Sequence, residues 1–211
     1  MFYNIMRAIF SPFINLLFPT KIIGPKKLPK GGAISVCNHL SATDTFVIAI
    51  KFRKNQSFLG KKELFKNPVI GWLLRALGAI SLDRSKSDMV AMRECVKRLK
   101  AGRHVTMFPE GTRNKESEDA MLELKGGACM FALKSGAPIV PMMLYRKPKL
   151  FCRNYLIVSE PLTFEEFQGK RLSREVLDGM SEQLTARFVS LREEVNAYAE
   201  SKKRKRLNSN G

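Results

Sequence analysis

Short apolar runs of strand-like composition alternate along this chain with longer stretches of helical periodicity. The clearest strand-like runs are Ala33–Cys37, residues 104–108 and Ile139–Leu144, and helical or turn-rich sequence follows each of them. Such alternation is typical of α/β domains, in which helices cover the faces of a central sheet. We therefore expect an α/β fold, with a single-domain central sheet flanked by helices.

The same patterns predict the remaining elements. Further strands are expected at 57–60, 78–84 and 155–158, and helices at 45–51, 68–77, 87–102, 128–134 and from residue 173 onward. Ser87 and Ser173 are expected to begin two of these helices, and Gly136 to end another. The last helix has an apolar stripe that predicts core packing, formed by Leu177, Met180, Leu184, Phe188, Leu191 and Val195.

The length of 211 residues fits one sizeable domain with small additions. Its 45% hydrophobic and 27% charged residues are those of a globular chain and exclude a disordered one. We expect an apolar membrane-associating helix over residues 1–20, one main globular domain over 21–200, and a basic, disordered tail over 201–211.

The first 18 residues are strongly apolar but include polar residues and a proline. This run is too short and too polar to predict a transmembrane span, and it lacks the clear features of a signal peptide. Pro12 is expected to kink any helix here. An interfacial helix fits better, because lysines follow it at positions 21, 26, 27 and 30. The alternative is a helix packed on the domain core.

A formal net charge of +18 sets a second constraint on function. It arises from 37 Lys and Arg residues against 19 Asp and Glu residues. Such a chain is attracted to polyanions, which include nucleic acid, an anionic membrane surface and phosphorylated substrates. The charge alone does not choose among them. A nucleic-acid-binding protein is one hypothesis, supported by the basic run 202–206, although no recognised nucleic-acid-binding motif is present.

The cysteines and histidines argue against disulfide and zinc chemistry. The four cysteines are widely spaced in apolar segments, without a Cys-x-x-Cys pair, at positions 37, 95, 129 and 152. We interpret them as reduced, buried thiols in a protein that faces the cytoplasm. Only two histidines are present, so a zinc site is not expected.

One of the histidines lies in the stretch Asn38-His-Leu-Ser-Ala-Thr-Asp44, directly after a strand-like run. Histidine is the side chain best suited to proton transfer near neutral pH, and a carboxylate can fix its tautomer. Five residues of helix turn through about 500°, so His39 must lie on the turn and Asp44 must reach back to it from the first helical turn. The alternative is that Ser41-x-x-Asp44 is a capping box and Asp44 an ordinary N-terminal carboxylate.

Other charged residues also follow predicted strands, where α/β domains gather their chemistry. If Lys61, Arg84 and Arg113 converge, they can bind a phosphomonoester. Each of these cations alone fits a surface ion pair equally well. Glu110, in a tight turn that ends in glycine, can accept a hydrogen bond from a substrate hydroxyl, or it can simply pair with Arg113.

Four sequence blocks occur in order along the chain: Asn38-His39-x4-Asp44, Gly78-Ala-Ile-Ser-Leu-Asp83-Arg84, Phe108-Pro-Glu-Gly-Thr-Arg113 and Ile139-Val-Pro141. Together they resemble the motifs of the glycerolipid acyltransferase family, and most closely those of its 1-acylglycerol-3-phosphate (lysophosphatidate) O-acyltransferases. The resemblance runs over residues 22–162 and includes 61–68 and 125–128. It departs from the family pattern at Ser81, where proline is frequent, and at Asn114, where serine is common.

The resemblance implies a role for each matching residue. His39 would be the general base that deprotonates the glycerol 2-hydroxyl, and Asp44 would orient it. Substrate contacts would come from the phosphate-binding Lys61, Arg84 and Arg113, from Glu110, Gly111 and Thr112 on the glycerol side, and from Pro141 toward the acyl chain.

The resemblance also implies the partners of the reaction. No metal or cofactor is expected, and the donor would be acyl-CoA or acyl-carrier protein. The acceptor would be lysophosphatidate, and the enzyme would associate with an anionic membrane surface at its cytoplasmic face. Glycerol 3-phosphate or another lysophospholipid is the alternative acceptor.

Overall fold

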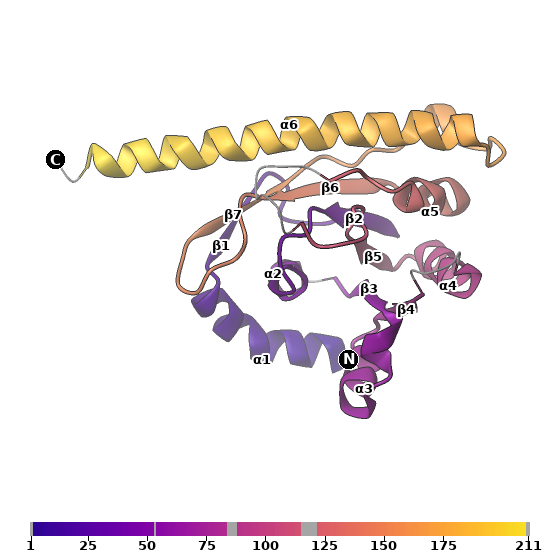
Figure 1. Cartoon of the computed structure of the whole chain (residues 1–211), viewed down its shortest axis with the longest axis horizontal. Coiled ribbons are helices and arrows are strands. Elements are labelled where there is room, and N and C mark those ends of the chain that lie inside the picture. The colour runs from indigo at the N-terminus through magenta and orange to yellow at the C-terminus, as the bar shows by residue number, and fades with distance from the viewer. Residues whose placement is uncertain (1, 53, 84–87, 115–121, 210–211) are drawn as a thin grey trace.

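The computed structural model describes residues 2–52, 54–83, 88–114 and 122–209. It is built around one sheet, in which all neighbouring strands are parallel except β6 and β7 (Figure 1). Across the sheet, its strands are β1 (Thr20–Ile23), β7 (Asn154–Val158), β6 (Ile139–Leu144), β2 (Ala33–Cys37), β5 (His104–Met107), β3 (Gln56–Lys61) and β4 (Ile80–Leu82). Because β1 is parallel to β7, these two run against the other strands. The predicted α/β fold with a central sheet is confirmed.

Helices cover both faces of this sheet. They are α1 (Phe2–Leu17), α2 (Thr43–Lys51), α3 (Pro68–Ala76), α4 (Met89–Lys100), α5 (Gly127–Ser135) and α6 (Arg174–Leu207), with short 3-10 turns η1 (Lys62–Phe65) and η2 (Glu165–Phe167). Figure 1 shows α6 lying across one side of the sheet, and α1 on the other side beyond α2.

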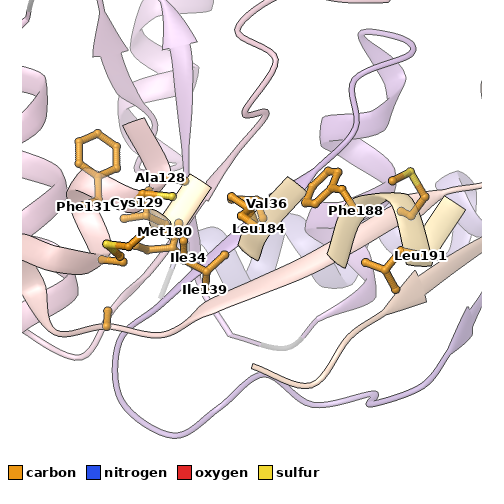
Figure 2. Packing of buried hydrophobic residues seen from close by; sticks show 14 of the residues in the cluster. Ile34, Val36, Ala128, Cys129, Phe131, Ile139, Met180, Leu184, Phe188 and Leu191 are labelled. Atoms are coloured by element: carbon orange, nitrogen blue, oxygen red, sulfur yellow. The ribbon is translucent and has the colours of Figure 1, made fainter. Parts of the chain in front are cut away.

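The face beneath α4, α5 and α6 contains the larger hydrophobic core. Ser173 begins α6 by accepting a hydrogen bond from the Val176 N–H at 3.3 Å. The predicted stripe of α6 then packs on the sheet, where Leu184 and Phe188 are each 1% exposed (Figure 2). The interpretation of this stripe as core packing is confirmed.

Helix α2 covers the opposite face. Ile48 of α2 and Phe52, which directly follows the helix, form a second buried cluster with residues of β2, β6 and β7. The N-terminal helix α1 packs on α2, and the Tyr3 hydroxyl donates to the Ala49 carbonyl at 3.2 Å. Most apolar side chains of α1 nevertheless remain exposed, so α1 packs on the domain through one side only. Among the described residues, no helix combines the length and the apolar character needed to cross a bilayer.

Several expected elements have the predicted bounds, and others differ for local reasons. Strands β2 and β6 match the sequence prediction, and Gly136 ends α5 with φ +73°. Helix α4 is capped by Asp88, which accepts from the Ala91 N–H at 2.9 Å. The predicted cap, Ser87, lies outside the described residues. The strand β1 was not predicted, because four residues between an apolar helix and a turn give little periodicity.

Two predictions about surface segments were wrong. The tail was expected to be disordered, but α6 continues to Leu207. Lys and Arg are good helix formers, and extending an existing helix costs far less than starting one. Cys152 was expected to be buried, but it is exposed on the connection between β6 and β7, whereas the other three cysteines are buried. Most of the polar loop expected at 114–119 lies outside the described residues.

The topology places the candidate residues at one edge of the sheet. Strands β6, β2, β5, β3 and β4 are parallel to one another, so their carboxyl ends lie on the same side. The turn that contains His39, the end of β3 and the loop after β5 therefore share this edge, where α/β sheets bind their ligands.

Candidate active site

The carboxylate of Asp44 is the centre of the turn between β2 and α2. It is 0% exposed, and its Oδ2 accepts hydrogen bonds from the Leu40 N–H at 2.7 Å and the Ser41 N–H at 2.6 Å. The same oxygen lies 3.0 Å from His39 Nδ1. Asp44 belongs to the first turn of α2, as the sequence predicted, and reaches back to the histidine on the turn.

The His39 ring is fixed in orientation and in tautomer. A carboxylate oxygen can only accept, so Nδ1 carries the proton and Nε2 is left as the basic nitrogen. Nε2 makes no hydrogen bond with any described residue, and the side chain is 12% exposed. The ring of Phe108 stacks on the imidazole, with centroids 3.8 Å apart and planes at 12°. The pair therefore presents an oriented base to the exterior.

The two interpretations of Asp44 hold at the same time. Its carboxylate accepts from the Ser41 N–H, which is one half of a capping box. The Ser41 hydroxyl accepts from the Thr43 N–H at 3.2 Å, one residue short of the Asp44 N–H that a full capping box would use. A single oxygen thus starts the helix and orients His39.

The backbone of His39 is held by the loop that follows β5. Val36 lies opposite Met107, and continuing that register by three residues sets His39 opposite Glu110. Glu110 Oε1 accepts from the His39 N–H at 3.1 Å, and the Asn114 N–H donates to the His39 carbonyl at 2.7 Å. In the structure Glu110 binds the turn that contains His39 rather than Arg113, and its predicted contact with a substrate hydroxyl stays a prediction.

Asn38 fixes the other side of the turn to β6. Its side-chain oxygen accepts from the Leu144 N–H at 2.7 Å, and its Nδ2 donates to the Leu144 carbonyl at 3.1 Å. These two bonds extend the ladder between β2 and β6 by one residue beyond the strands. Sequence reasoning did not assign Asn38 a role, although it directly precedes the histidine.

A buried guanidinium from α6 stands behind this arrangement. Arg192 is 7% exposed, and its Nη1 donates to the Tyr145 carbonyl at 3.1 Å and lies 3.5 Å from the Leu144 carbonyl. Its position was detectable in the sequence, because it follows Phe188 by four residues and so faces the core. Its positive charge acts on the buried carboxyl of Glu110.

Burial is the main influence on Glu110. It raises the pKa of this carboxyl to about 7, and the negative charge of Asp44 also acts to raise it. The His39 N–H and the charge of Arg192 oppose this shift. With a pKa of about 7, Glu110 changes its protonation state near neutral pH while its Oε1 accepts from the His39 N–H.

A lysine that sequence reasoning did not single out lies over the turn after Glu110. Gly111 has φ +69°, and a Cβ placed there would lie 3.0–3.1 Å from the terminal atoms of Lys125. The Lys125 N–H donates to the Pro109 carbonyl at 2.9 Å, which holds its backbone against the same turn. In the sequence this lysine was noted only as part of the matching block 125–128, and the contact itself was not predicted.

The remaining predicted residues are less tightly organised. Strand β3 leaves β5 after Phe58 and pairs with β4, so Lys61 lies toward the edge of the sheet, where it is exposed and 3.7 Å from Glu63. Thr112 and Arg113 are exposed on the loop after β5. Arg84 lies outside the described residues.

Pro141 is a structural residue of the sheet. It is buried within β6 opposite Val36, and its carbonyl accepts from the Ser159 N–H at 2.9 Å, just beyond the end of β7. Proline has no N–H to donate, but Pro141 lies at the end of the hydrogen-bond ladder between β6 and β7, where a missing donor is tolerated. An acyl-chain contact by Pro141 stays a prediction.

Comparison with known proteins identifies the class. The profile of the family named Acyltransferase matches residues 19–145, which is more than half of the chain. The chain belongs to this acyltransferase family, as the resemblance of its sequence blocks predicted.

The similar proteins share a more specific name. A 1-acyl-sn-glycerol-3-phosphate acyltransferase of Bacillus subtilis is 30% identical over 90% of this chain and 96% of its own length. A chloroplastic enzyme of the same name from Brassica napus is 32% identical over 63% of this chain, which spans only 39% of that relative. The crystal structure of the 1-acyl-sn-glycerophosphate acyltransferase PlsC from Thermotoga maritima is similar with a TM-score of 0.70, at 26% identity, over 93% of this chain and 79% of that one.

The raised pKa of Glu110 predicts a pH-dependent stability. The folded state holds this proton up to about pH 7, whereas an ordinary glutamate releases it near pH 4.5. The stabilising contribution is complete below pH 4.5 and is lost as the pH rises through 7. Relative to Glu110→Gln, the wild type should lose roughly 1–3 kcal/mol of unfolding free energy between these limits.

Urea unfolding at several pH values measures this difference. Glu110→Gln keeps an oxygen that can accept from the His39 N–H but removes the titration. Glu160→Gln, at an exposed carboxyl, is the control and should follow the wild type. Parallel pH curves for wild type and Glu110→Gln would show that Glu110 does not titrate in this range.

Proposed function

We propose that this protein transfers a fatty acyl group from an acyl thioester to the 2-hydroxyl of 1-acylglycerol 3-phosphate, which yields phosphatidic acid. The observation that carries the proposal is the His39–Asp44 pair, in which Nδ1 is bound to a buried carboxylate and Nε2 is open. The names of similar proteins that align with nearly the whole chain support the same reaction.

The reaction begins with proton transfer to His39. Nε2 takes the proton of the acceptor hydroxyl while the oxygen attacks the thioester carbonyl carbon. The imidazolium that forms is stabilised by Asp44, and the tetrahedral oxyanion collapses by breaking its C–S bond. The carrier leaves as a thiolate, which recovers the proton from His39. The base acts directly on the substrate, so the reaction has no covalent enzyme intermediate.

Cations at the same sheet edge would bind the acceptor's phosphate. Lys61 and Arg113 are exposed there, and Lys125 lies against Gly111. Together with Arg84 they form the cation set proposed for this phosphate, with the glycerol near Gly111 and Thr112. The donor would be acyl-CoA or acyl-carrier protein, and the reaction needs no metal or bound cofactor.

His39→Ala should lower turnover by at least a hundredfold, because general-base catalysis contributes about 10²–10⁴-fold. Phosphatidate formation from lysophosphatidate is measured with acyl-CoA and with acyl-carrier protein as donor. Arg113→Ala, which keeps the base, should mainly raise the KM for lysophosphatidate.

The acceptor panel includes glycerol 3-phosphate and a lysophospholipid without a phosphomonoester. Faster acylation of either one would assign the chain to an alternative acceptor. Full activity of His39→Ala would sink the mechanism. Salt-sensitive binding to nucleic acid that is unaffected by His39→Ala, together with inactivity on every acceptor, would instead support the nucleic-acid hypothesis.

We further propose that the enzyme docks on the membrane surface through α1 and α3. The ring of Phe2 on α1 contacts Trp72 on α3, with centroids 6.1 Å apart, and Figure 1 shows α3 beside the N-terminal end of α1. Both helices expose large apolar side chains: Ile5, Ile9, Phe10, Phe13 and Leu16 from α1, and Val69, Ile70 and Trp72 from α3. Such a surface fits the boundary between headgroups and acyl chains, on the proposed cytoplasmic face.

Phe13→Gln with Leu16→Gln should weaken binding to phosphatidylcholine vesicles at least tenfold, because two exposed apolar side chains no longer enter the interface. These side chains are 60% and 67% exposed, so the fold should tolerate the change. The control is Val189→Gln with Leu207→Gln, two exposed apolar residues of α6. Equal vesicle binding by both double variants would exclude α1 as the docking helix. Sedimentation with vesicles measures the binding.

A further inference from the structure

A cavity of about 530 Å³ lies at the end of α2 that is distant from His39. Five lysines surround it and two buried apolar residues contribute to its wall: Lys26, Lys27, Lys30, Lys51 and Lys54, with Leu28 and Phe52. Three of these lysines come from the connection between β1 and β2, and two from the end of α2 and the residues after it. We call this cavity the lysine pocket.

The lysine pocket has a concentrated positive charge. No carboxylate is among the described residues that line it, and none of its five lysines forms an ion pair with a described residue. Lys51 Nζ donates to the Asn15 side-chain oxygen at 2.5 Å, and Lys54 Nζ donates to the Pro29 carbonyl at 2.6 Å. Both acceptors are neutral, so none of the described residues that line the pocket compensates its positive charge.

Lys51 of the pocket and the nearby His104 both have lowered pKa values. Burial lowers the pKa of Lys51, because its ammonium is partly withdrawn from water. Burial also lowers the pKa of His104 to about 4, and the charge of Lys54 lowers it further. An anion in the lysine pocket would relieve the mutual repulsion of its lysine ammonium groups.

The position of the lysine pocket separates it from the proposed acceptor site. Asp44 lies in the first turn of α2 and Lys51 is its last residue, so the two are about 10 Å apart along the helix. Residues 26–30 precede β2, whereas His39 follows it. The lysine pocket therefore lies toward the amino end of β2, and the base lies at the carboxyl end.

The position of α1 beside the lysine pocket indicates the source of the ligand that this pocket binds. Asn15, which accepts the bond from Lys51, lies on α1 between the exposed Phe13 and Leu16. A ligand in the lysine pocket is thus held beside the helix whose apolar side chains we propose to enter the membrane. Charged headgroups occupy the layer directly above such a helix.

We propose that the lysine pocket binds the phosphate headgroup of an anionic membrane phospholipid, separate from the acceptor and the donor. The proposal rests on membrane docking through α1 but not on the identity of the reaction. The site sets a second contact with the membrane, which orients the sheet edge with His39 relative to the bilayer. Binding to the membrane is then expected to rise with its content of anionic lipid.

The test compares vesicles of phosphatidylcholine alone with vesicles that also contain phosphatidylglycerol. Lys26→Gln, Lys27→Gln and Lys30→Gln are combined in one variant, because all three side chains are exposed and none forms a hydrogen bond or ion pair with the described part of the chain. The charge-matched control combines Lys134→Gln, Lys170→Gln and Arg174→Gln, which are exposed near α5 and the start of α6. Turnover of lysophosphatidate in detergent micelles is measured alongside.

The wild type should bind the anionic vesicles more strongly than vesicles of phosphatidylcholine alone. In the lysine-pocket variant the ratio of these two affinities should fall at least tenfold, while binding to phosphatidylcholine alone is unchanged. The control variant should keep the preference, and turnover in micelles should be unchanged in both. An equal loss in the control would show that net charge alone is responsible and would overturn the proposal. An unchanged preference in the lysine-pocket variant would overturn it as well.

Two further outcomes separate other ligands from a lipid headgroup. If the variant instead binds soluble CoA more weakly with its vesicle preference intact, the lysine pocket belongs to the donor and the proposal is wrong. Loss of turnover in micelles by the variant would place the pocket in the catalytic site, which also contradicts it. A wild type that is inactive in micelles but prefers anionic vesicles would refute the proposed function alone.

Discussion

The structure of the candidate site depends on the buried carboxylate of Asp44. Burying a carboxylate is costly unless hydrogen bonds replace its water, and hydrogen bonds to charged groups stabilise by about 1.5–3 kcal/mol each. Asp44 Oδ2 accepts three such bonds, from two backbone N–H groups and from His39 Nδ1. The turn cannot move without breaking them. The start of α2, the path of the backbone and the direction of the imidazole are therefore set by one oxygen atom.

The surrounding layers hold this turn from both sides. The loop after β5 binds both backbone groups of His39, and β6 binds the side chain of Asn38. Helix α6 contributes Arg192, which donates to the Tyr145 carbonyl and whose positive charge acts on the buried carboxyl of Glu110. The two faces of the sheet are thus covered by different elements. One contains the large core under α6, and the other presents α2 with α1 outside it (Figure 1).

The sequence predicted the features that follow from local patterns and from chain order. Apolar runs placed β2 and β6, and the five-residue spacing placed His39 on the turn with Asp44 in the first helical turn. It did not predict that Glu110 would bind the backbone of His39, because that contact depends on the register between β2 and β5. The stacking of Phe108 and the placement of Lys125 over Gly111 likewise need the tertiary structure.

The central claim is that Asp44 orients and supports His39 as the base, and kinetics of Asp44→Asn test it most directly. The amide oxygen can still accept from the turn, but the side chain can no longer stabilise an imidazolium by charge. At saturating lysophosphatidate, kcat should fall by about 10²–10⁴-fold, while the KM for lysophosphatidate stays within a few-fold of wild type. A folded Asp44→Asn enzyme that keeps the wild-type kcat would contradict the account.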